Sequence, residues 1–294
     1  MHAHDRSGRG LRRLRATVHL VAASILASAL PAATLGAQEG AACEGARVTA
    51  VEIRPEAPAI IDRSAPRWAR PVLRVLLQSR TTDTSAIRPY VLLGEGESCS
   101  EFERAETERL LRAQPYLAEA KVRTVAEEGG VRAIVETQDD IPLIVGLSLD
   151  DGTPSRVLFG NANVLGLGML ASAEWERGYA YRDGFGAHFE HYHVLGGRRV
   201  AKLHAVRSPL SADYAASLAR PYLTGAQRFA WSANYARSEG WLGFPNPGDD
   251  AISLENARDL YGLAALWRIG GRNRRLLAGA TLGHERGSRA EEGV

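Results

Sequence analysis

The chain has 294 residues, in which 36 lysines and arginines nearly balance 34 aspartates and glutamates, so the formal net charge is +2. Residues 1–37 contain five arginines and one aspartate, a net charge of +4, which leaves −2 for the rest of the chain. The basic excess therefore gives no reason to expect nucleic-acid binding. After residue 37 no stretch reaches about 18 consecutive apolar residues. Together with a mean hydropathy of −0.20, this argues against a helical membrane protein but not against a β-barrel.

Residues 1–37 have the pattern of a secretory signal peptide. A basic stretch that includes Arg12, Arg13 and Arg15 precedes an apolar stretch from Leu20 to Ala33, and small residues suitable for cleavage follow. The apolar stretch is too short to span a membrane and contains Pro31, so it is not an anchor. We therefore expect the protein to be exported and residues 1–37 to be removed.

The sequence contains two cysteines, Cys43 and Cys99. In an exported protein an even pair is more often bridged than free, so we predict a Cys43–Cys99 disulfide. Two unpaired thiols are the alternative. Two cysteines without suitably spaced histidines do not form a zinc site.

Residues 44–138 are predicted to form a small α+β unit, which begins with a strand. Arg47 to Arg54 alternates in polarity as a strand does. A proline-rich connector follows, and then a possible helix from Trp68 to Gln78 that is interrupted by Pro71.

Two further helices are predicted in this unit. Thr84 to Leu93 is expected to be short or bent, because Pro89 removes one helical hydrogen bond. The next helix, Glu101 to Ala113, is preceded by the capping-box residues Ser100 and Glu103.

A β-hairpin is expected to complete the unit. Ala120 to Ala126 and Val131 to Glu136 alternate as strands around the turn Glu127-Glu128-Gly129-Gly130. The predicted order is strand, helix, helix, strand, strand.

From Leu143 onward the chain alternates in polarity with no helical segment. In the clearest strand Phe229, Trp231, Ala233 and Tyr235 share one face, and Arg228, Ser232 and Asn234 lie on the other. Segments of about ten residues with one small and aromatic face suit a membrane-spanning barrel strand better than the shorter strands of a soluble sandwich. We therefore predict an all-β antiparallel barrel in which the aromatic face contacts lipid.

Nine barrel strands are predicted within residues 143–294. Short glycine-rich connections at 194–197, 223–226 and 270–271 fall at one end, and the longest, 239–256, falls at the other, as in bacterial barrels. The strands are Leu143–Asp150, Ser155–Asn161, Gly168–Arg177, Arg182–Tyr192, Arg198–Arg207, Asp213–Tyr222, Gln227–Ser238, Ala257–Ile269 and Arg272–His284.

Four segments in order resemble a known family. Residues 105–112, Ala-Glu-Thr-Glu-Arg-Leu-Leu-Arg, and 116–122, Tyr-Leu-Ala-Glu-Ala-Lys-Val, are similar to the acidic helix and following strand of a POTRA domain. Residues 160–168, Gly-Asn-Ala-Asn-Val-Leu-Gly-Leu-Gly, resemble the turn between the second and third barrel strands, and residues 181–199 the next strand and turn. The chain thus resembles the outer-membrane protein insertase superfamily, in particular BamA/TamA-like bacterial surface antigens.

The resemblance implies a periplasmic POTRA-like domain at 44–138 and a barrel of about sixteen strands, of which 143–294 would be the first part. Nine strands cannot close in lipid, and the chain ends without an aromatic-ended last strand, so we interpret it as a piece of a longer protein. A miscounted, smaller barrel is the alternative.

The implied function is assembly, insertion or translocation of other outer-membrane proteins, without a cofactor and without enzymatic activity. The expected partners are unfolded outer-membrane or secreted clients, the lipid bilayer, and periplasmic accessory subunits or chaperones, with no nucleic acid. The alternatives are a dedicated two-partner-type secretion translocator, a pore or binding protein of the outer membrane, and a soluble periplasmic β-sandwich.

Two candidate sites follow from this function. Clients would add a strand to the hairpin edge formed by Lys121, Val122, Arg123, Thr124 and Val125. The first barrel strand, with Leu143, Val145, Leu147 and Leu149 on one face, would form one side of a seam that a client strand can use as a template.

A group of histidines and three pairs of aspartates do not indicate a metal site or a catalytic site. His188 lies on the opposite strand face from His191 and His193, so the three do not converge on a metal. The pairs Asp139-Asp140, Asp150-Asp151 and Asp249-Asp250 are interpreted as turn or connector residues that separate strands, rather than as an acid/base pair.

Overall fold

The computed structural model describes residues 43–58, 80–178, 182–208, 211–224, 227–244, 252–270 and 276–292. The predicted signal peptide and the predicted helix Trp68–Gln78 lie outside these ranges. No helix within them is long and apolar enough to cross a membrane.

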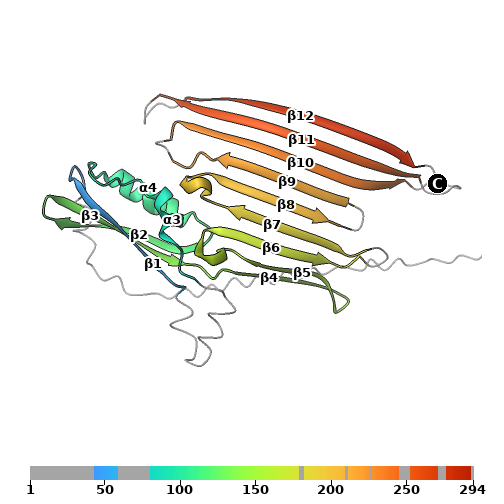
Figure 1. Ribbon diagram of the computed structural model, residues 1–294, viewed down its shortest axis with the longest axis horizontal. Helices are drawn as coiled ribbons and strands as arrows, with labels where there is room; N and C mark the ends of the chain where they lie inside the picture. Colours follow the sequence, from blue (N-terminus) through green and yellow to red (C-terminus); the bar gives the residue numbers. More distant parts are fainter. Residues whose placement is uncertain are drawn as a thin grey trace, which may run out of the picture.

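The first part of the chain forms an α/β unit in the predicted order of elements (Figure 1). Its sheet has the order β1-β3-β2, with β1 parallel and β2 antiparallel to the central β3. The elements are β1 Val48–Glu56, α3 Thr84–Ile87, the 3₁₀ turn Arg88–Tyr90, α4 Glu101–Arg112, β2 Leu117–Glu127 and β3 Gly130–Asp139.

The two described helices differ from the predictions at their ends. The helix expected over Thr84–Leu93 stops at Ile87 and continues as a 3₁₀ turn through Pro89, which has no N–H for a helical bond. Ser100 is the N-cap of α4, but its side chain makes no capping hydrogen bond, so the predicted capping box is wrong in that respect. The Glu44 carboxylate accepts from the Glu101 N–H instead, at 3.0 Å.

The core of the α/β unit lies between its sheet and its helices. Its largest fully buried side chains include Tyr90, Tyr116, Leu110 and Leu111. The structure contains the Cys43–Cys99 disulfide, with a Cα–Cα distance of 5.2 Å. This bond joins the residues just before β1 to the loop just before α4.

The rest of the described chain forms one nine-stranded antiparallel sheet, in sequence order from β4 to β12. The nine strands correspond to those predicted. They are β4 Leu143–Asp150, β5 Thr153–Asn161, β6 Met169–Glu176, β7 Gly184–His191, β8 Val200–Arg207, β9 Ser211–Arg220, β10 Phe229–Phe244, β11 Ile252–Ile269 and β12 Leu276–Glu292.

The long connection predicted from Glu239 to Asn256 is wrong in length. The ladder between β10 and β11 continues without a break from Phe229↔Trp267 to Phe244↔Ile252. Backbone pairing therefore extends beyond the alternating segment, which was the signal that set the predicted ends.

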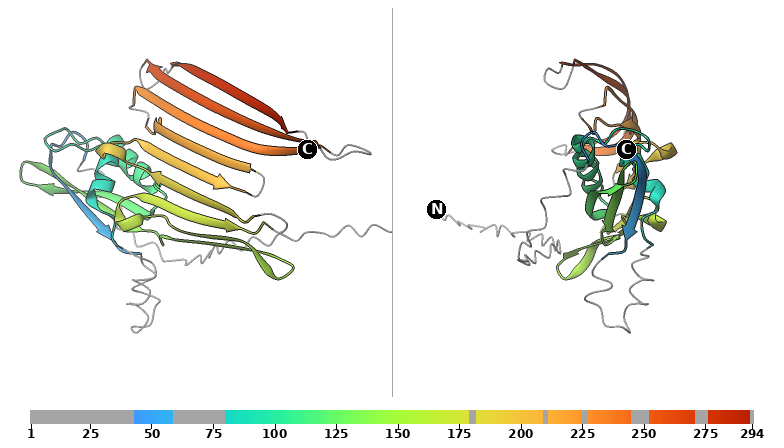
Figure 2. Two further views of the ribbon diagram at one scale, coloured as in Figure 1. Left: turned by 45° about the vertical axis from the view of Figure 1, so that its right-hand side comes forward. Right: turned by 90° about the vertical axis from the view of Figure 1, so that its left-hand side faces the viewer.

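The sheet is curved and open (Figures 1 and 2). Among the described residues, β4 pairs only with β5 and β12 only with β11. The connections after β5, β7 and β9 begin at one end of the sheet, and the α/β unit sits at this same end (Figure 1).

The register places the apolar side chains of successive strands on one common face. Between β10 and β11, Trp231 is opposite Ala265, Ala233 opposite Leu263, and Tyr235 opposite Tyr261. Ser232 and Asn234 pair with Ala264 and Gly262 on the other face. The predicted division of β10 into two faces therefore agrees with the observed pairing.

Candidate functional site: an edge strand and a docked α/β unit

The edge strand β4 carries the four side chains predicted for the seam. Leu143, Val145, Leu147 and Leu149 alternate along it and share the apolar face, with Val145 64% and Leu147 54% exposed. Their neighbours in register continue the apolar face, since Val145 is opposite Phe159 and Leu147 opposite Val157.

The apolar face extends over the whole sheet. Large apolar side chains are exposed on strands as far apart as β5 and β12, including Phe159, Leu203, Leu263 and Leu282. Patches larger than a few hundred Å² are rare on soluble monomers, and they mark contact with lipid or with another protein.

The opposite face carries charged side chains that pair across strands. Lys202 of β8 contacts Glu190 of β7 at 3.0 Å, His188 contacts Glu190 at 2.8 Å, and Arg156 of β5 pairs with Glu174 of β6. One face is therefore apolar and the other polar, as in a barrel that separates lipid from a wet lumen.

The histidines of β7 and of the turn after it do not converge on one point. The rings of His191 and His193 are 4.7 Å apart, whereas His188 lies near His204 at 5.8 Å. Within the part of the chain that the structure describes, no group of three or more potential ligands is arranged to hold a metal ion.

Three turns at one end of the sheet, which we call the junction turns, contact the α/β unit. They comprise residues 163–168, 192–199 and 221–224. The first two contain the same three residues, Val-Leu-Gly, in a 3₁₀ turn, with a left-handed leucine in each: Leu165 at φ 56° and Leu195 at φ 55°.

A buried chain of hydrogen bonds holds the first junction turn. Asn163 Nδ2 donates to Thr82 Oγ1 at 2.8 Å, and Thr82 Oγ1 donates to Asp139 Oδ1 at 2.6 Å. The Thr82 N–H also donates to Asp139 Oδ2 at 2.8 Å, and the Gly168 N–H donates to Asn163 Oδ1 at 2.9 Å. The three side chains are at most 4% exposed, so neither the strand end nor the turn can separate without breaking buried bonds.

Asp139 is the acidic group of this chain of bonds. Burial raises the pKa of its carboxyl, while the two hydrogen bonds from Thr82 oppose that change. Asp139 is the last residue of β3, which agrees with the prediction that Asp139-Asp140 separates two strands, and its carboxylate also receives two hydrogen bonds inside the junction.

The second and third junction turns are held by other residues of the α/β unit. The Tyr90 hydroxyl donates to the Tyr192 carbonyl at 2.6 Å, and the rings of Tyr116 and Tyr192 are 5.9 Å apart. Arg109 Nη2 of α4 donates to the Leu223 carbonyl at 2.5 Å. The turns of three successive hairpins therefore all contact the α/β unit.

Sequence patterns identified the turn at 160–168 but not its partners. Thr82 is 81 residues from Asn163 and Tyr90 is 102 residues from Tyr192, so no local period could connect them. The one feature of the sequence that could have indicated these contacts is an acidic residue, Asp139, at the end of a strand with a buried pattern.

The predicted client-binding edge lies on β2, which is indeed an edge strand of its sheet. Side chains of α4 already bind its outward peptide groups at two residues. Arg104 Nη1 donates to the Val122 carbonyl at 2.6 Å and the Val122 N–H donates to Glu108 at 3.1 Å. Arg112 Nε donates to the Ala120 carbonyl at 2.9 Å. A strand added here would have to displace these three side chains.

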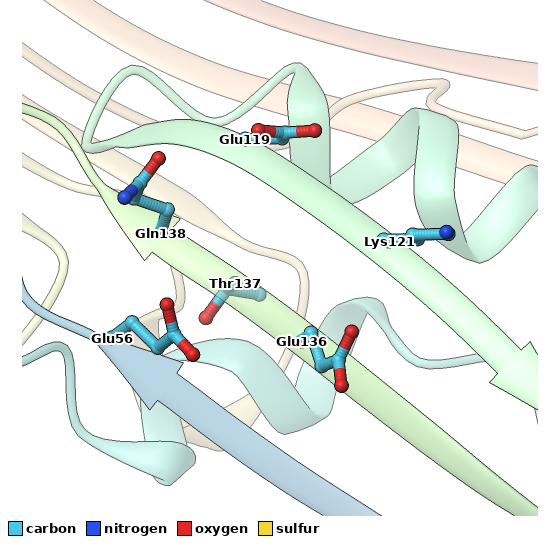
Figure 3. A pocket seen from close by; sticks show the side chains of 6 residues that line it. All are labelled: Glu56, Glu119, Lys121, Glu136, Thr137 and Gln138. Carbon is cyan, nitrogen blue, oxygen red and sulfur yellow. The ribbon is translucent and has the colours of Figure 1, made fainter. Parts of the chain in front are cut away.

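An acidic pocket of about 240 Å³ opens on the far face of the same sheet (Figure 3). Its lining side chains come from β1, β2 and β3 and include three carboxylates and one amine. One of these carboxylates, Glu136, is paired with Arg123. The lining residues are Glu56, Glu119, Lys121, Glu136, Thr137 and Gln138.

No protein-family model and no curated protein matches the chain. Among solved structures, BamA from Haemophilus ducreyi lacking POTRA domains 1–3 is similar, with 11% identity and a TM-score of 0.35. CdiB from Acinetobacter baumannii is similar with 10% identity and a TM-score of 0.37. The matches cover 80% and 83% of this chain but only 36% and 46% of those two chains.

Proposed function

We propose that the protein is an outer-membrane β-barrel protein that acts in assembly, insertion or translocation of other outer-membrane proteins. The observation that carries this proposal is β4, an edge strand with no second neighbour among the described residues. The unpaired peptide groups of an edge strand can pair with a strand of another chain. A client strand that pairs with β4 would satisfy its backbone before it enters lipid.

The apolar face supports the membrane location. A barrel strand needs about 9–11 residues to cross the hydrocarbon core, and β9 to β12 have 10, 16, 18 and 17 residues. In this proposal residues 143–294 belong to the barrel, and the apolar face contacts the bilayer.

We assign residues 44–138 to a POTRA-like domain on the periplasmic side. Its strand-helix-helix-strand-strand order, its contacts with the short connections of the sheet and its disulfide, which suits an oxidising compartment, all support this assignment. The unit would receive unfolded clients that arrive through the periplasm, alone or with accessory subunits or chaperones.

Two strands can then contact a client in different ways. In our proposal β4 is the template, because it lies at the edge of the sheet and pairs only with β5 among the described residues. Capture at Lys121–Val125 of β2 is a second step, which requires α4 to release the backbone of Ala120 and Val122.

Depletion of the protein in its own cells tests the proposal. We expect the levels of many outer-membrane proteins to fall together, measured by quantitative proteomics of purified outer membranes. Loss of one secreted product with normal outer-membrane proteins would instead identify a dedicated translocator. An unchanged outer membrane and unchanged secretion would contradict both functions.

A further inference from the structure

The apolar face of the nine-stranded sheet forms a band that covers only part of the longer strands. On β4 the band runs from Leu143 to Leu149, and on β11 it runs from Tyr261 to Ile269. On β12 it runs from Leu276 to Leu282. Alternate residues of each range share this face. Because β11 and β12 have 18 and 17 residues, the band covers about half of each strand.

The position of the band shifts steadily from strand to strand. Gly146, in the middle of the band on β4, is connected through successive partners in register to Arg258 on β11. The middle of the band on β11 is Ala265, which is seven residues nearer the α/β unit than Arg258. The band therefore shifts by about one residue per strand. A shift of about 3.3 Å along a strand for about 4.8 Å across the sheet corresponds to a tilt of about 35°, as in membrane barrels.

An aromatic row ends the band on β10 to β12, on the side away from the α/β unit (Figure 1). Tyr235 is opposite Tyr261, and Tyr261 is opposite His284. Their ring centroids are 5.0 and 6.2 Å apart. The Tyr235 hydroxyl donates to Asp259 at 2.9 Å, so its polar end is directed away from the band. Aromatic rings with a polar tip are typical of the boundary between hydrocarbon and headgroups.

A charged row follows the aromatic row on the same face. Arg237 is opposite Asp259, and Asp259 is opposite Arg286. Arg237 also contacts two carboxylates, at 2.6 Å to Glu239 and at 3.7 Å to Asp259. A lipid-facing charge costs much at the middle of a membrane and little at its interfaces. The charged row therefore belongs outside the hydrocarbon core.

The three strands continue beyond the charged row as a paired sheet. The ladder of β10 and β11 runs without a break from Arg237↔Asp259 to Phe244↔Ile252. The ladder of β11 and β12 likewise runs from Asp259↔Arg286 to Ser253↔Glu292. We call this part of the sheet the outer ribbon. It comprises residues 237–244, 252–259 and 286–292.

We propose that the outer ribbon stands outside the membrane, and that the charged row at its base contacts the lipid headgroups of the outer leaflet. The row of Tyr235, Tyr261 and His284 then marks the outer edge of the hydrocarbon core. The proposal rests on the proposed function in one respect, which is that the apolar face contacts lipid. It adds the depth of each strand in the bilayer and an outer surface that is built from paired strands.

Two alanines on the same face of β11 give a matched test. Ala257 lies in the outer ribbon opposite Glu239, and Ala265 lies in the middle of the band opposite Trp231. Because the native cysteines are paired with each other, Ala257→Cys and Ala265→Cys each introduce one reactive thiol. Each variant of the full-length protein is labelled with a nitrobenzoxadiazole fluorophore and folded into lipid vesicles. The quenchers are lipids brominated in the middle of their acyl chains and iodide in the outer solution.

We expect brominated lipid to quench the label at position 265 at least about threefold more than the label at position 257, because only the former lies at the depth of the acyl chains. Iodide should show the reverse order. Heat-modified gel mobility checks that each labelled variant has folded. Strong quenching of both labels by brominated lipid, with iodide reaching neither, would overturn the proposal but leave the lipid contact of the apolar face in place. Equal quenching of both labels by iodide would overturn the membrane location as well.

A second measurement in intact cells avoids labelling before folding. A polyethylene glycol maleimide that is too large to cross the outer membrane is added to cells that express each cysteine variant. We expect it to modify the Ala257→Cys protein and to leave the Ala265→Cys protein unmodified. No modification of the Ala257→Cys protein, or equal modification of both proteins, would contradict an outer ribbon outside the membrane. Neither measurement depends on client insertion, so both are separate from the depletion experiment.

Discussion

Thr82 links the α/β unit to the sheet through one hydroxyl group, which accepts from Asn163 and donates to Asp139. Thr82→Val keeps the shape of the side chain but leaves the buried Asn163 amide and the Asp139 carboxyl each without one partner. We expect it to lower the free energy of unfolding by about 1–3 kcal/mol for the buried groups left unpaired. Urea unfolding of the detergent-solubilised protein measures the change.

Thr137 supplies the control within the same unit. It is also buried, but its hydroxyl makes no hydrogen bond in the described chain. Thr137→Val should therefore be neutral or stabilising. Equal losses in the two threonine variants would mean that the hydrogen bonds of Thr82 do not hold the junction.

Two glycines in identical Val-Leu-Gly turns separate the backbone strain of a turn from its contact with the α/β unit. Gly166 has φ 74°, and a Cβ atom there would lie 2.5 Å from the Thr81 carbonyl oxygen. Gly196 has φ 65°, and nothing lies within 4 Å of the same position. Both alanine variants suffer the left-handed backbone cost, but only Gly166→Ala also pushes against the segment before α3.

We expect Gly166→Ala to be less stable than Gly196→Ala by about 1–3 kcal/mol, the usual cost of overpacking. Urea unfolding, together with the rate of limited proteolysis of the α/β unit, measures the difference. Equal stability of the two variants would show that the segment before α3 does not pack tightly against the first junction turn.

At the scale of strands, the two faces of β10 give a direct test of lipid contact. Ala233 and Ser232 are adjacent, and they lie on the apolar and polar faces. Ala233→Arg should cost about 2–4 kcal/mol near the middle of the membrane, whereas Ser232→Arg should cost much less. Folding of the full-length protein into lipid vesicles, followed by heat-modified gel mobility, compares them. Similar costs at both positions would contradict a lipid-facing surface.

The strands were predictable because alternation is a local signal that needs only neighbouring residues. Leu143–Asp150 has the same ends in the prediction and in the structure, since turn residues stop the alternation at Asp150 and Asp151. In β10 and β11 the pairing of backbones continues where the alternation weakens, and the predicted ends failed. Alternating polarity indicates that a strand has one buried face, but it does not indicate how far the strand stays paired with its neighbour.

At the scale of the molecule, the contacts between the α/β unit and the sheet could not be predicted from the sequence. Asp139, Tyr90 and Arg109 are ordinary residues in their own segments, and each gains its role from a residue far along the chain. The covered edge of β2 is another example, because it depends on where α4 packs. Such contacts depend on tertiary packing and leave no period in the sequence.

The central claim is that β4 accepts a strand from a client. Ser148 lies on this edge strand, and Ser172 lies on the same face of β6, which is paired on both sides. The two native cysteines are paired with each other, so Ser148→Cys and Ser172→Cys each introduce one reactive thiol. The most direct measurement is disulfide capture, in cells, of an outer-membrane client that carries one cysteine in its last strand. We predict a client adduct with Ser148→Cys and none with Ser172→Cys. No adduct at Ser148, or equal adducts at both positions, would contradict the claim.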